Sequence, residues 1–156
     1  MTATIQPRLP ATFTAARVSR IDGPFELVEL PLPGLRPGHV LVRIRAAGVS
    51  PLDTKIRAGK AAHARQPLPA VLGMDLAGEV VAVGAGVTRL AVGDEVYGLA
   101  GGIGGLQGTL AEYAAIDADL LARKPASLSM REAAALPLNA ITAWEGLVDR
   151  ANVRAG

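Results

Sequence analysis

The run that most resembles a cofactor-binding motif is glycine-rich and spans residues 101–108 (GGIGGLQG). In a G-x-G-x-x-G fingerprint, the backbone amides of the loop and of the helix after it hold a pyrophosphate. Here Gln107 occupies the position of the third glycine, and the run leads into a predicted strand, Leu110–Ile116. The pattern therefore predicts a flexible or tightly turned loop and not a phosphate-binding site.

Metal ligands and nucleophiles are also sparse in this sequence. The chain has no cysteine, which excludes disulfides, thiolate nucleophiles and cysteine-bearing metal sites. Its two histidines, His39 and His63, lie far apart, and no acid-dense loop offers oxygen ligands. The serines show no G-x-S-x-G spacing. We therefore expect no metal and no acyl-transfer chemistry.

The composition excludes several further classes of protein. With 156 residues, 50% of them hydrophobic and 19% charged, the chain is expected to be globular. Five aromatic residues are too few for a base-stacking platform, and the basic residues are scattered, so we expect no nucleic-acid partner. The longest uncharged window, Val96–Ala111, is too short and too glycine-rich to span a bilayer. No secretory signal is visible, and we expect a cytoplasmic protein without a membrane partner.

Short strands between Gly/Pro turns must position whatever site the chain carries. Alternating or β-branched runs predict five strands, at Phe25–Leu30, His39–Ala46, Gly78–Val83, Glu95–Tyr97 and Leu110–Ile116. This spacing favours a mainly β (α+β) fold, built as a small sandwich or barrel, over alternating strands and helices.

Helices are predicted only near the end of the chain. Ser129 and Glu132 have the spacing of a capping box, and the helix they begin meets Pro137. A second helix is predicted from Leu138 to about Val148, with Ile141, Trp144 and Val148 on one face. This apolar stripe either packs back onto the strands, or is exposed and drives self-association.

Four ordered motifs then identify a family. They are G-V-S-P-x-D at 48–53, G-M-D-x-A-G-x-V-x-x-V-G at 73–84, V-G-D-x-V at 92–96 and A-L-P-x-x-x-x-T-A-W at 135–144. Over essentially its whole length the chain resembles the medium-chain dehydrogenase/reductase superfamily, and most of all its zinc-free quinone oxidoreductase branch. The resemblance implies a GroES-like, partly open β-barrel with short C-terminal helices. It implies a substrate-side domain over residues 1–128 and a helical segment over 129–156 that leads toward a Rossmann domain lying outside this chain.

The same resemblance bears on zinc. In the zinc-dependent relatives, a cysteine ligand occupies the position of Ser50 and a histidine ligand that of Met74, while Leu138 lies near the third ligand position. None of these three side chains is a zinc ligand of the usual kind. We therefore expect no metal.

Four site residues follow from the resemblance. It implies that Ser50 and Asp53 line the cleft near the nicotinamide, that Lys55 lies on the substrate side, and that Thr142 binds the nicotinamide end of the cofactor. Each also has a purely structural interpretation: Asp53 can cap a turn, Ser50 can belong to that turn, Lys55 can be solvated, and Thr142 can bond a preceding carbonyl. We expect Asp75 to be structural.

The reaction implied is hydride transfer from NADPH or NADH to a quinone or to an α,β-unsaturated carbonyl compound. Ser50 or Lys55 would stabilise the charge that develops on the substrate oxygen. The expected partners are this small substrate and the Rossmann domain, with a homo-oligomer also possible. The alternative is a free-standing GroES-like module that binds partners or oligomerises without catalysis.

Overall fold

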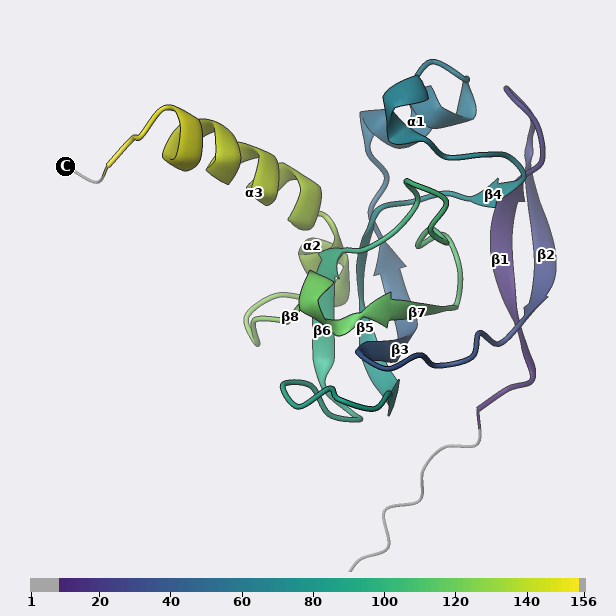
Figure 1. Ribbon diagram of the computed structural model, residues 1–156, viewed down its shortest axis with the longest axis horizontal. Coiled ribbons are helices and arrows are strands. Elements are labelled where there is room, and N and C mark those ends of the chain that lie inside the picture. The colour runs from purple at the N-terminus through teal and green to yellow at the C-terminus, as the bar shows by residue number, and fades with distance from the viewer. Residues whose placement is uncertain (1–8, 155–156) are drawn as a thin grey trace, which may run out of the picture.

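The computed structural model describes residues 9–154 and consists of two open antiparallel sheets with short helices (Figure 1). The smaller sheet has the order β2-β1-β4, and the larger has the order β7-β3-β5-β6-β8. The predicted mainly β fold with short helices is confirmed, and over the described residues neither sheet closes into a barrel. The strands are β1 (Thr12–Val18), β2 (Phe25–Pro31), β3 (His39–Ala47), β4 (Ala70–Val71), β5 (Asp75–Val83), β6 (Glu95–Leu99), β7 (Tyr113–Asp117) and β8 (Leu121–Arg123).

The core lies against the larger sheet, where alternate residues of β3 and β5 point inward. Val40 and Val42 of β3 and Leu76 and Val80 of β5 are completely buried in one cluster. Helix α2 (Met130–Ala134) packs against the same sheet through small residues, with Ala77 and Ala133 fully buried. The capping box predicted at Ser129 and Glu132 begins this helix, as expected.

Two differences from the predicted strands lie next to each other in the structure. β1 has no counterpart among the predictions, and Leu110–Glu112 does not extend β7 as expected. The amide of Ala16 in β1 donates to Leu110 O, while the amide of Ile44 in β3 donates to Glu112 O. Residues 110–112 therefore cross from one sheet to the other and cannot pair along a single strand.

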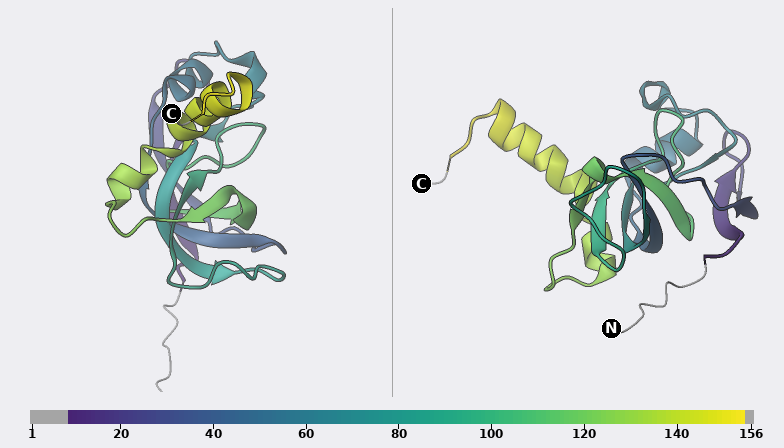
Figure 2. Two further views of the ribbon diagram at one scale, coloured as in Figure 1. Left: turned by 90° about the vertical axis from the view of Figure 1, so that its left-hand side faces the viewer. Right: turned by 60° about the horizontal axis from the view of Figure 1, so that its bottom comes forward.

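The remaining helices lie at the top and side of the sheets. They are α1 (Pro51–Arg57), the short 3₁₀ turns η1 (Ala62–Ala64) and η2 (Ala118–Leu120), α3 (Pro137–Trp144) and a π-helical continuation, η3 (Glu145–Arg150). Figures 1 and 2 show α3–η3 projecting away from both sheets.

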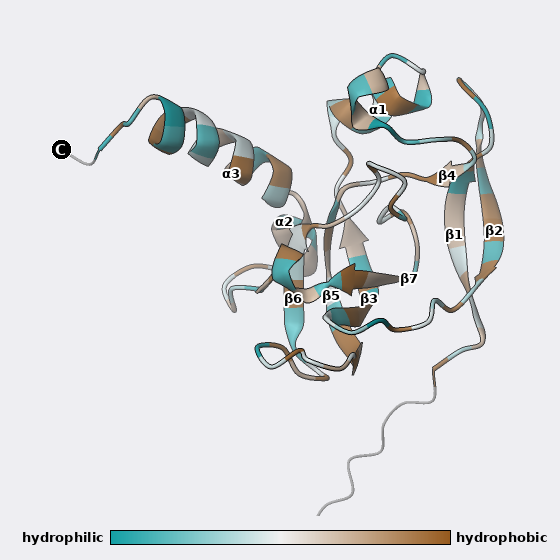
Figure 3. Cartoon of the chain, in the orientation of Figure 1, coloured by the Kyte–Doolittle hydropathy of each residue, from teal (hydrophilic) through white to brown (hydrophobic). Residues whose placement is uncertain are grey.

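The projecting helix corrects one of the two alternatives for its apolar stripe. Ile141, Trp144 and Val148 do not pack back onto the strands: Trp144 is 63% exposed and Ile141 52% exposed. Figure 3 shows apolar residues along a helix that no other described element covers. The predicted division at residue 129 stays a prediction. Helix α2, which follows residue 129, packs on the larger sheet, and α3–η3 projects from it (Figure 1).

Candidate functional site

Four buried polar or charged residues lie in one region of the described chain. They are Ser50, Asp53, Asp75 and Thr109. Buried polar groups are costly unless they are hydrogen-bonded. Here they are joined in one network where the end of β3, the start of α1, the start of β5 and the glycine-rich loop meet. We take this network as the framework of the candidate site.

Asp53 fixes the beginning of α1. Its Oδ2 accepts hydrogen bonds from the Ser50 amide (2.8 Å) and from the Ser50 hydroxyl (3.1 Å), and its Oδ1 accepts one from the Gly73 amide (3.1 Å). Pro51 at the first helical position suits this start, because its missing N–H would have no partner in the helix. The carboxylate therefore holds Ser50 in place and ties α1 to the segment before β5.

Thr109 forms the next link in the network. It lies beside Gly73, a position that has no room for a side chain. Gly73 has a φ of +97°, and a Cβ there would lie 2.6 Å from Thr109 Oγ1. The Thr109 amide donates to Gly73 O (3.0 Å), and its hydroxyl donates to Asp75 O (2.9 Å). The glycine-rich loop is thus joined to the same framework as Ser50.

Asp75 carries the network to the last helices. Its Oδ1 accepts a hydrogen bond of 2.8 Å from the amide of Leu138, near the start of α3. Burial raises the pKa of this carboxyl, the hydrogen bond from Leu138 lowers it, and the charge of Asp53 raises it further. The net direction is upward. The hydrogen bond to Leu138 agrees with the structural role expected for Asp75, which stays a prediction.

The structure brings Ser50 and Asp53 together but joins neither Lys55 nor Thr142 to them. Lys55 is exposed on α1, and its ammonium has no carboxylate or hydrogen-bond partner among residues 9–154. Thr142 is exposed on the projecting α3. Their roles at the site stay predictions, as do those of Ser50 and Asp53.

The positions that hold zinc in metal-dependent relatives do not fit a zinc ion here. The Ser50 hydroxyl already donates to Asp53, Met74 is buried with a thioether as its only donor, and Leu138 has no donor in its side chain. Over the described part of the chain, no three His, Cys, Asp or Glu side chains gather closely enough to hold a metal ion. The side-chain chemistry of this site is therefore hydrogen bonding.

The glycine-rich loop uses its own amides and does not present them to an anion. The Gly104 amide donates to Ala64 O (2.8 Å) and the Gly105 amide to Gln66 Oε1 (2.9 Å). Gln66 Nε2 donates in turn to Leu106 O (3.2 Å). The two bonds of the Gln66 side chain hold a tightly turned loop against the segment after α1. With these amides in use, the loop does not fit a pyrophosphate.

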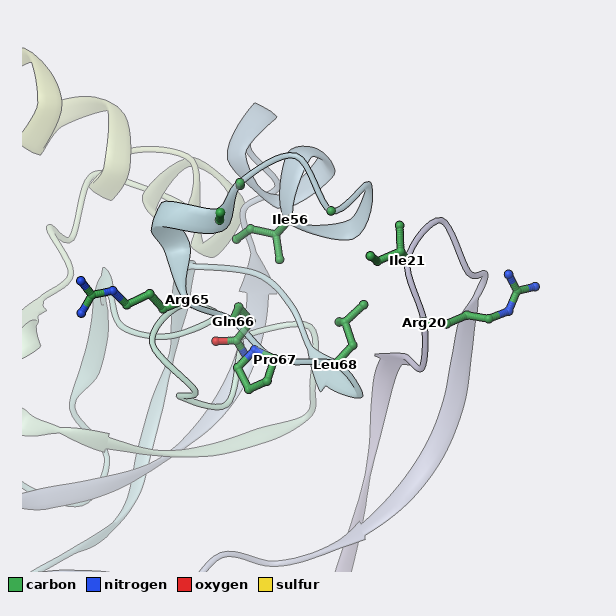
Figure 4. Close-up of a pocket in the computed structure, with 10 residues that line it drawn as sticks. Arg20, Ile21, Ile56, Arg65, Gln66, Pro67 and Leu68 are labelled. Carbon is green, nitrogen blue, oxygen red and sulfur yellow. The ribbon is translucent and has the colours of Figure 1, made fainter.

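A pocket of about 720 Å³ lies apart from this network (Figure 4). Ile21, Ile56 and Leu68 face into it, while Arg20 and Arg65 lie at opposite ends with their guanidinium groups directed outward. None of Ser50, Asp53, Lys55 and Thr142 lines it.

Comparison with known proteins places this geometry in a family. The alcohol dehydrogenase GroES-like domain matches residues 36–126, and the chain belongs to that family. A 2-methylene-furan-3-one reductase of Solanum lycopersicum is 48% identical over 120 residues, which cover 74% of this chain and 31% of that protein. A chloroplastic NADPH-dependent alkenal/one oxidoreductase of Arabidopsis thaliana is 44% identical over 75% of this chain and 31% of that protein.

Solved structures agree with this assignment. An alcohol dehydrogenase superfamily protein from Novosphingobium aromaticivorans shares 63% identity at a TM-score of 0.91, over 93% of this chain and 44% of that one. The quinone oxidoreductase from Coxiella burnetii shares 29% identity at a TM-score of 0.81, over 93% of this chain and 47% of that one. The predicted membership of the medium-chain dehydrogenase/reductase superfamily is confirmed, and the chain spans less than half of each of these relatives.

Two residues of the framework, and Gln66 beside the glycine-rich loop, were not predicted from the sequence. Thr109, Gly73 and Gln66 act through bonds to residues distant in the chain, so no local pattern marks them. One signal was available, since Ser50 and Asp53 have the spacing of a helix cap and Pro51 lies between them.

Proposed function

We propose that this chain is the substrate-side domain of an NADPH-dependent, zinc-independent oxidoreductase that reduces quinones or α,β-unsaturated carbonyl compounds. The proposal depends chiefly on the identity of 48% and 44% to relatives named 2-methylene-furan-3-one reductase and NADPH-dependent alkenal/one oxidoreductase. The second name favours NADPH over NADH, although the residues that select between them lie outside this chain.

The side chains at the site suit the stabilisation of negative charge on a substrate oxygen. A bound nicotinamide would supply a hydride to a carbon of the enone or quinone. Negative charge would then develop on the substrate oxygen, where a hydrogen-bond donor lowers the barrier. The Ser50 hydroxyl donates to Asp53, whereas the ammonium of Lys55 has no partner among the described residues. We therefore assign the oxygen to Lys55, with Ser50 as the second donor after rotation of its hydroxyl. Asp53 positions Ser50, Thr142 contacts the nicotinamide end, and water supplies the final proton.

The activity is best tested in a chimera. This chain would replace the matching part of the 63% identical Novosphingobium protein, whose remaining length would complete the enzyme. We expect oxidation of NADPH with a quinone or a small enone, unaffected by chelators. Lys55→Ala should lower kcat by about tenfold or more, in the lower range of losses seen when one stabilising donor is removed. Lys55→Arg should retain part of the activity, because it keeps the charge.

The matched control is Lys60→Ala, which removes another exposed lysine just beyond the end of α1. It should leave kcat unchanged. An unsubstituted chimera that oxidises no NADPH with any quinone or enone, or that oxidises simple alcohols only after zinc is added, would contradict the proposal.

Zinc independence has a separate test on this chain alone. The side chains of Ser50, Met74 and Leu138 give zinc no ligand of the usual kind, so dialysed protein should contain no stoichiometric zinc. One zinc per chain by elemental analysis would contradict this part of the proposal.

The exposed stripe on α3–η3 favours a second candidate function. Ile141, Trp144 and Leu147 are each more than half exposed, which suits a surface that a partner covers. In the proposed enzyme the Rossmann domain covers it; in the alternative, a free-standing GroES-like module uses it to bind a partner or a second copy. A reading frame that continues past Gly156 into a strand and a G-x-G-x-x-G loop would favour the enzyme.

The location of the protein belongs to the proposal as well. No helix within residues 9–154 is long and apolar enough to cross a membrane. We propose a cytoplasmic enzyme. Two similar plant proteins are named as chloroplastic, so an organelle is the competing location. Cell fractionation distinguishes the two locations.

A further inference from the structure

Within residues 9–154, one hydrogen bond joins the projecting helix to the sheets, beside the packing of its first turn on β5 and β6. Among the described residues, the bond from the Leu138 amide to Asp75 Oδ1 is the one that joins residues 137–150 to any part of the chain before residue 135. Pro137 is buried, but every residue from Asn139 to Arg150 is exposed. The direction of α3–η3 is therefore set within its first turn.

Asp75 is held far more firmly than the helix that it binds. Its backbone is paired with Leu99 in β6, and its carbonyl accepts hydrogen bonds from the Gly48 amide (3.0 Å) and from Thr109 Oγ1. A Cβ at Gly48 would lie 2.9 Å from Asp75 Cβ and 2.5 Å from Ala134 O, so the absence of a side chain there allows the close approach. The carboxylate has a fixed position relative to the sheet.

The same framework reaches the candidate site. Asp53 binds the Gly73 amide, Gly73 O binds the Thr109 amide, and the Thr109 hydroxyl binds Asp75 O. A continuous series of hydrogen bonds thus runs from the Ser50–Asp53 pair to the first turn of α3. A second, shorter route runs from Gly48, just before Ser50, whose amide also donates to Asp75 O. Both routes pass through Asp75.

We propose that Asp75 is a positioning residue that sets the direction in which α3–η3 leaves the substrate-side domain. A carboxylate suits this task, since the first amides of a helix have no partner within it and the helix dipole favours negative charge there. In the proposed enzyme, the direction of this helix decides where the nicotinamide meets Ser50 and Lys55. The effect on the nicotinamide depends on the proposed function, whereas the role of Asp75 in directing α3–η3 does not.

The single tryptophan of the chain lies on this helix and reports its motion directly. In the unsubstituted chain, the fluorescence anisotropy of Trp144 should decay mainly with the tumbling of the whole domain. Asp75→Ala should add a fast segmental component and increase hydrogen exchange at the Leu138 amide. Asp75→Asn keeps an acceptor oxygen in the same place and should restore slow decay and slow exchange.

The control removes a comparable carboxylate elsewhere. Asp94, just before β6, accepts a hydrogen bond of 2.9 Å from the Ala91 amide at Oδ2 and forms an ion pair with Arg123, so neither of its partners belongs to α3. Asp94→Ala should lower stability without changing the anisotropy decay of Trp144. The proposal fails if Asp75→Ala leaves the Trp144 decay and the Leu138 exchange unchanged, or if Asp94→Ala changes the decay equally.

The chimera tests the consequence for the reaction. Asp75→Ala should lower kcat about tenfold while the KM for the quinone or enone changes less than twofold, because the substrate-side groups stay in place. Asp75→Asn should recover most of kcat. An inactive unsubstituted chimera would count against the proposed function alone, since the fluorescence result would still decide the role of Asp75. Equal losses in kcat for the Ala and Asn variants would overturn the positioning role.

Discussion

Asp53 and Asp75 are both buried carboxylates that bind the first turn of a helix, yet they fix their helices in different ways. Asp53 belongs to α1 itself and binds Ser50, three residues earlier in the chain. Asp75 belongs to β5 and binds Leu138, 63 residues later. A helix capped by its own residue is defined locally, whereas a helix capped from a strand takes its direction from that strand. The bonds of Asp53 position Ser50 within the candidate site, and the bond of Asp75 positions α3–η3 relative to that site.

The largest expected effect is the loss of the local cap. Asp53→Ala should lower the free energy of unfolding by about 3 kcal/mol or more, because it leaves the Ser50 amide, the Ser50 hydroxyl and the Gly73 amide without their acceptor. Urea unfolding followed by far-UV circular dichroism measures this. Asp53→Asn, which keeps one acceptor oxygen, should cost clearly less, and equal costs for the two variants would contradict the role of the carboxylate.

A smaller effect, which depends on pH, is expected at the distant cap. The raised pKa of Asp75 means that the folded state favours the protonated form, so this contribution to stability is present at low pH and is lost as pH rises through the folded-state pKa. The stability of Asp75→Asn relative to the unsubstituted chain should therefore increase from pH 4 to pH 7. A difference that stays constant over this range would show that the pKa is not raised.

An exposed counterpart of the Ser50–Asp53 pair allows burial to be separated from capping. Ser129 and Glu132 make the same kind of local cap on α2, and the hydrogen bonds from the Ser129 hydroxyl and amide lower the pKa of Glu132. Its contribution to stability is present above the ordinary pKa of a glutamate and is lost as pH falls through the lowered value. Glu132→Gln should shift the urea midpoint only slightly at pH 7, and not at all at low pH. A shift as large as that of Asp53→Asn would remove the distinction.

The smallest effect is expected at the far end of the helix that Asp75 binds. Trp144 is 63% exposed, so Trp144→Ala should change the free energy of unfolding by less than about 1 kcal/mol. A tryptophan buried against the strands would instead give a loss of about 3–5 kcal/mol. Red-shifted, readily quenched emission from a monomer would agree with exposure. Blue-shifted emission in a monomer would contradict it.

Local patterns were enough to predict much of the fold. The alternating residues of β3 and the spacing of Ser129 and Glu132 record interactions within a few positions, and both elements form where expected. The crossing at Leu110–Glu112 was missed because its carbonyl oxygens accept hydrogen bonds from two different sheets. A run of suitable residues does not show which partner strand is near.

In the candidate site, too, contacts between neighbours in sequence could be predicted and contacts between distant residues could not. Ser50 and Asp53 meet because they are close in sequence, so their pairing could be predicted. The bond between Asp75 and Leu138 depends on how β5 and the last helices pack, which no local pattern encodes. The spacing of Ile141, Trp144 and Val148 is the same for a helix that packs on its own sheet and for one that leaves this face exposed. An amphipathic pattern shows that a face suits burial and does not show what covers it.

The length of α3–η3 makes the bond at its base a demanding one. Its eight and six residues form a lever of about 20 Å at roughly 1.5 Å per residue. A rotation of about 10° about Leu138 would move the far end of this lever by about 3.5 Å. Reactive groups must be held within about 0.5 Å of their working positions. In the proposed enzyme, that tolerance over this lever corresponds to roughly 1.5° of rotation. Within the described chain, the Asp75–Leu138 bond and the buried Pro137 lie at the base of the lever, where a small displacement has the largest effect at its far end.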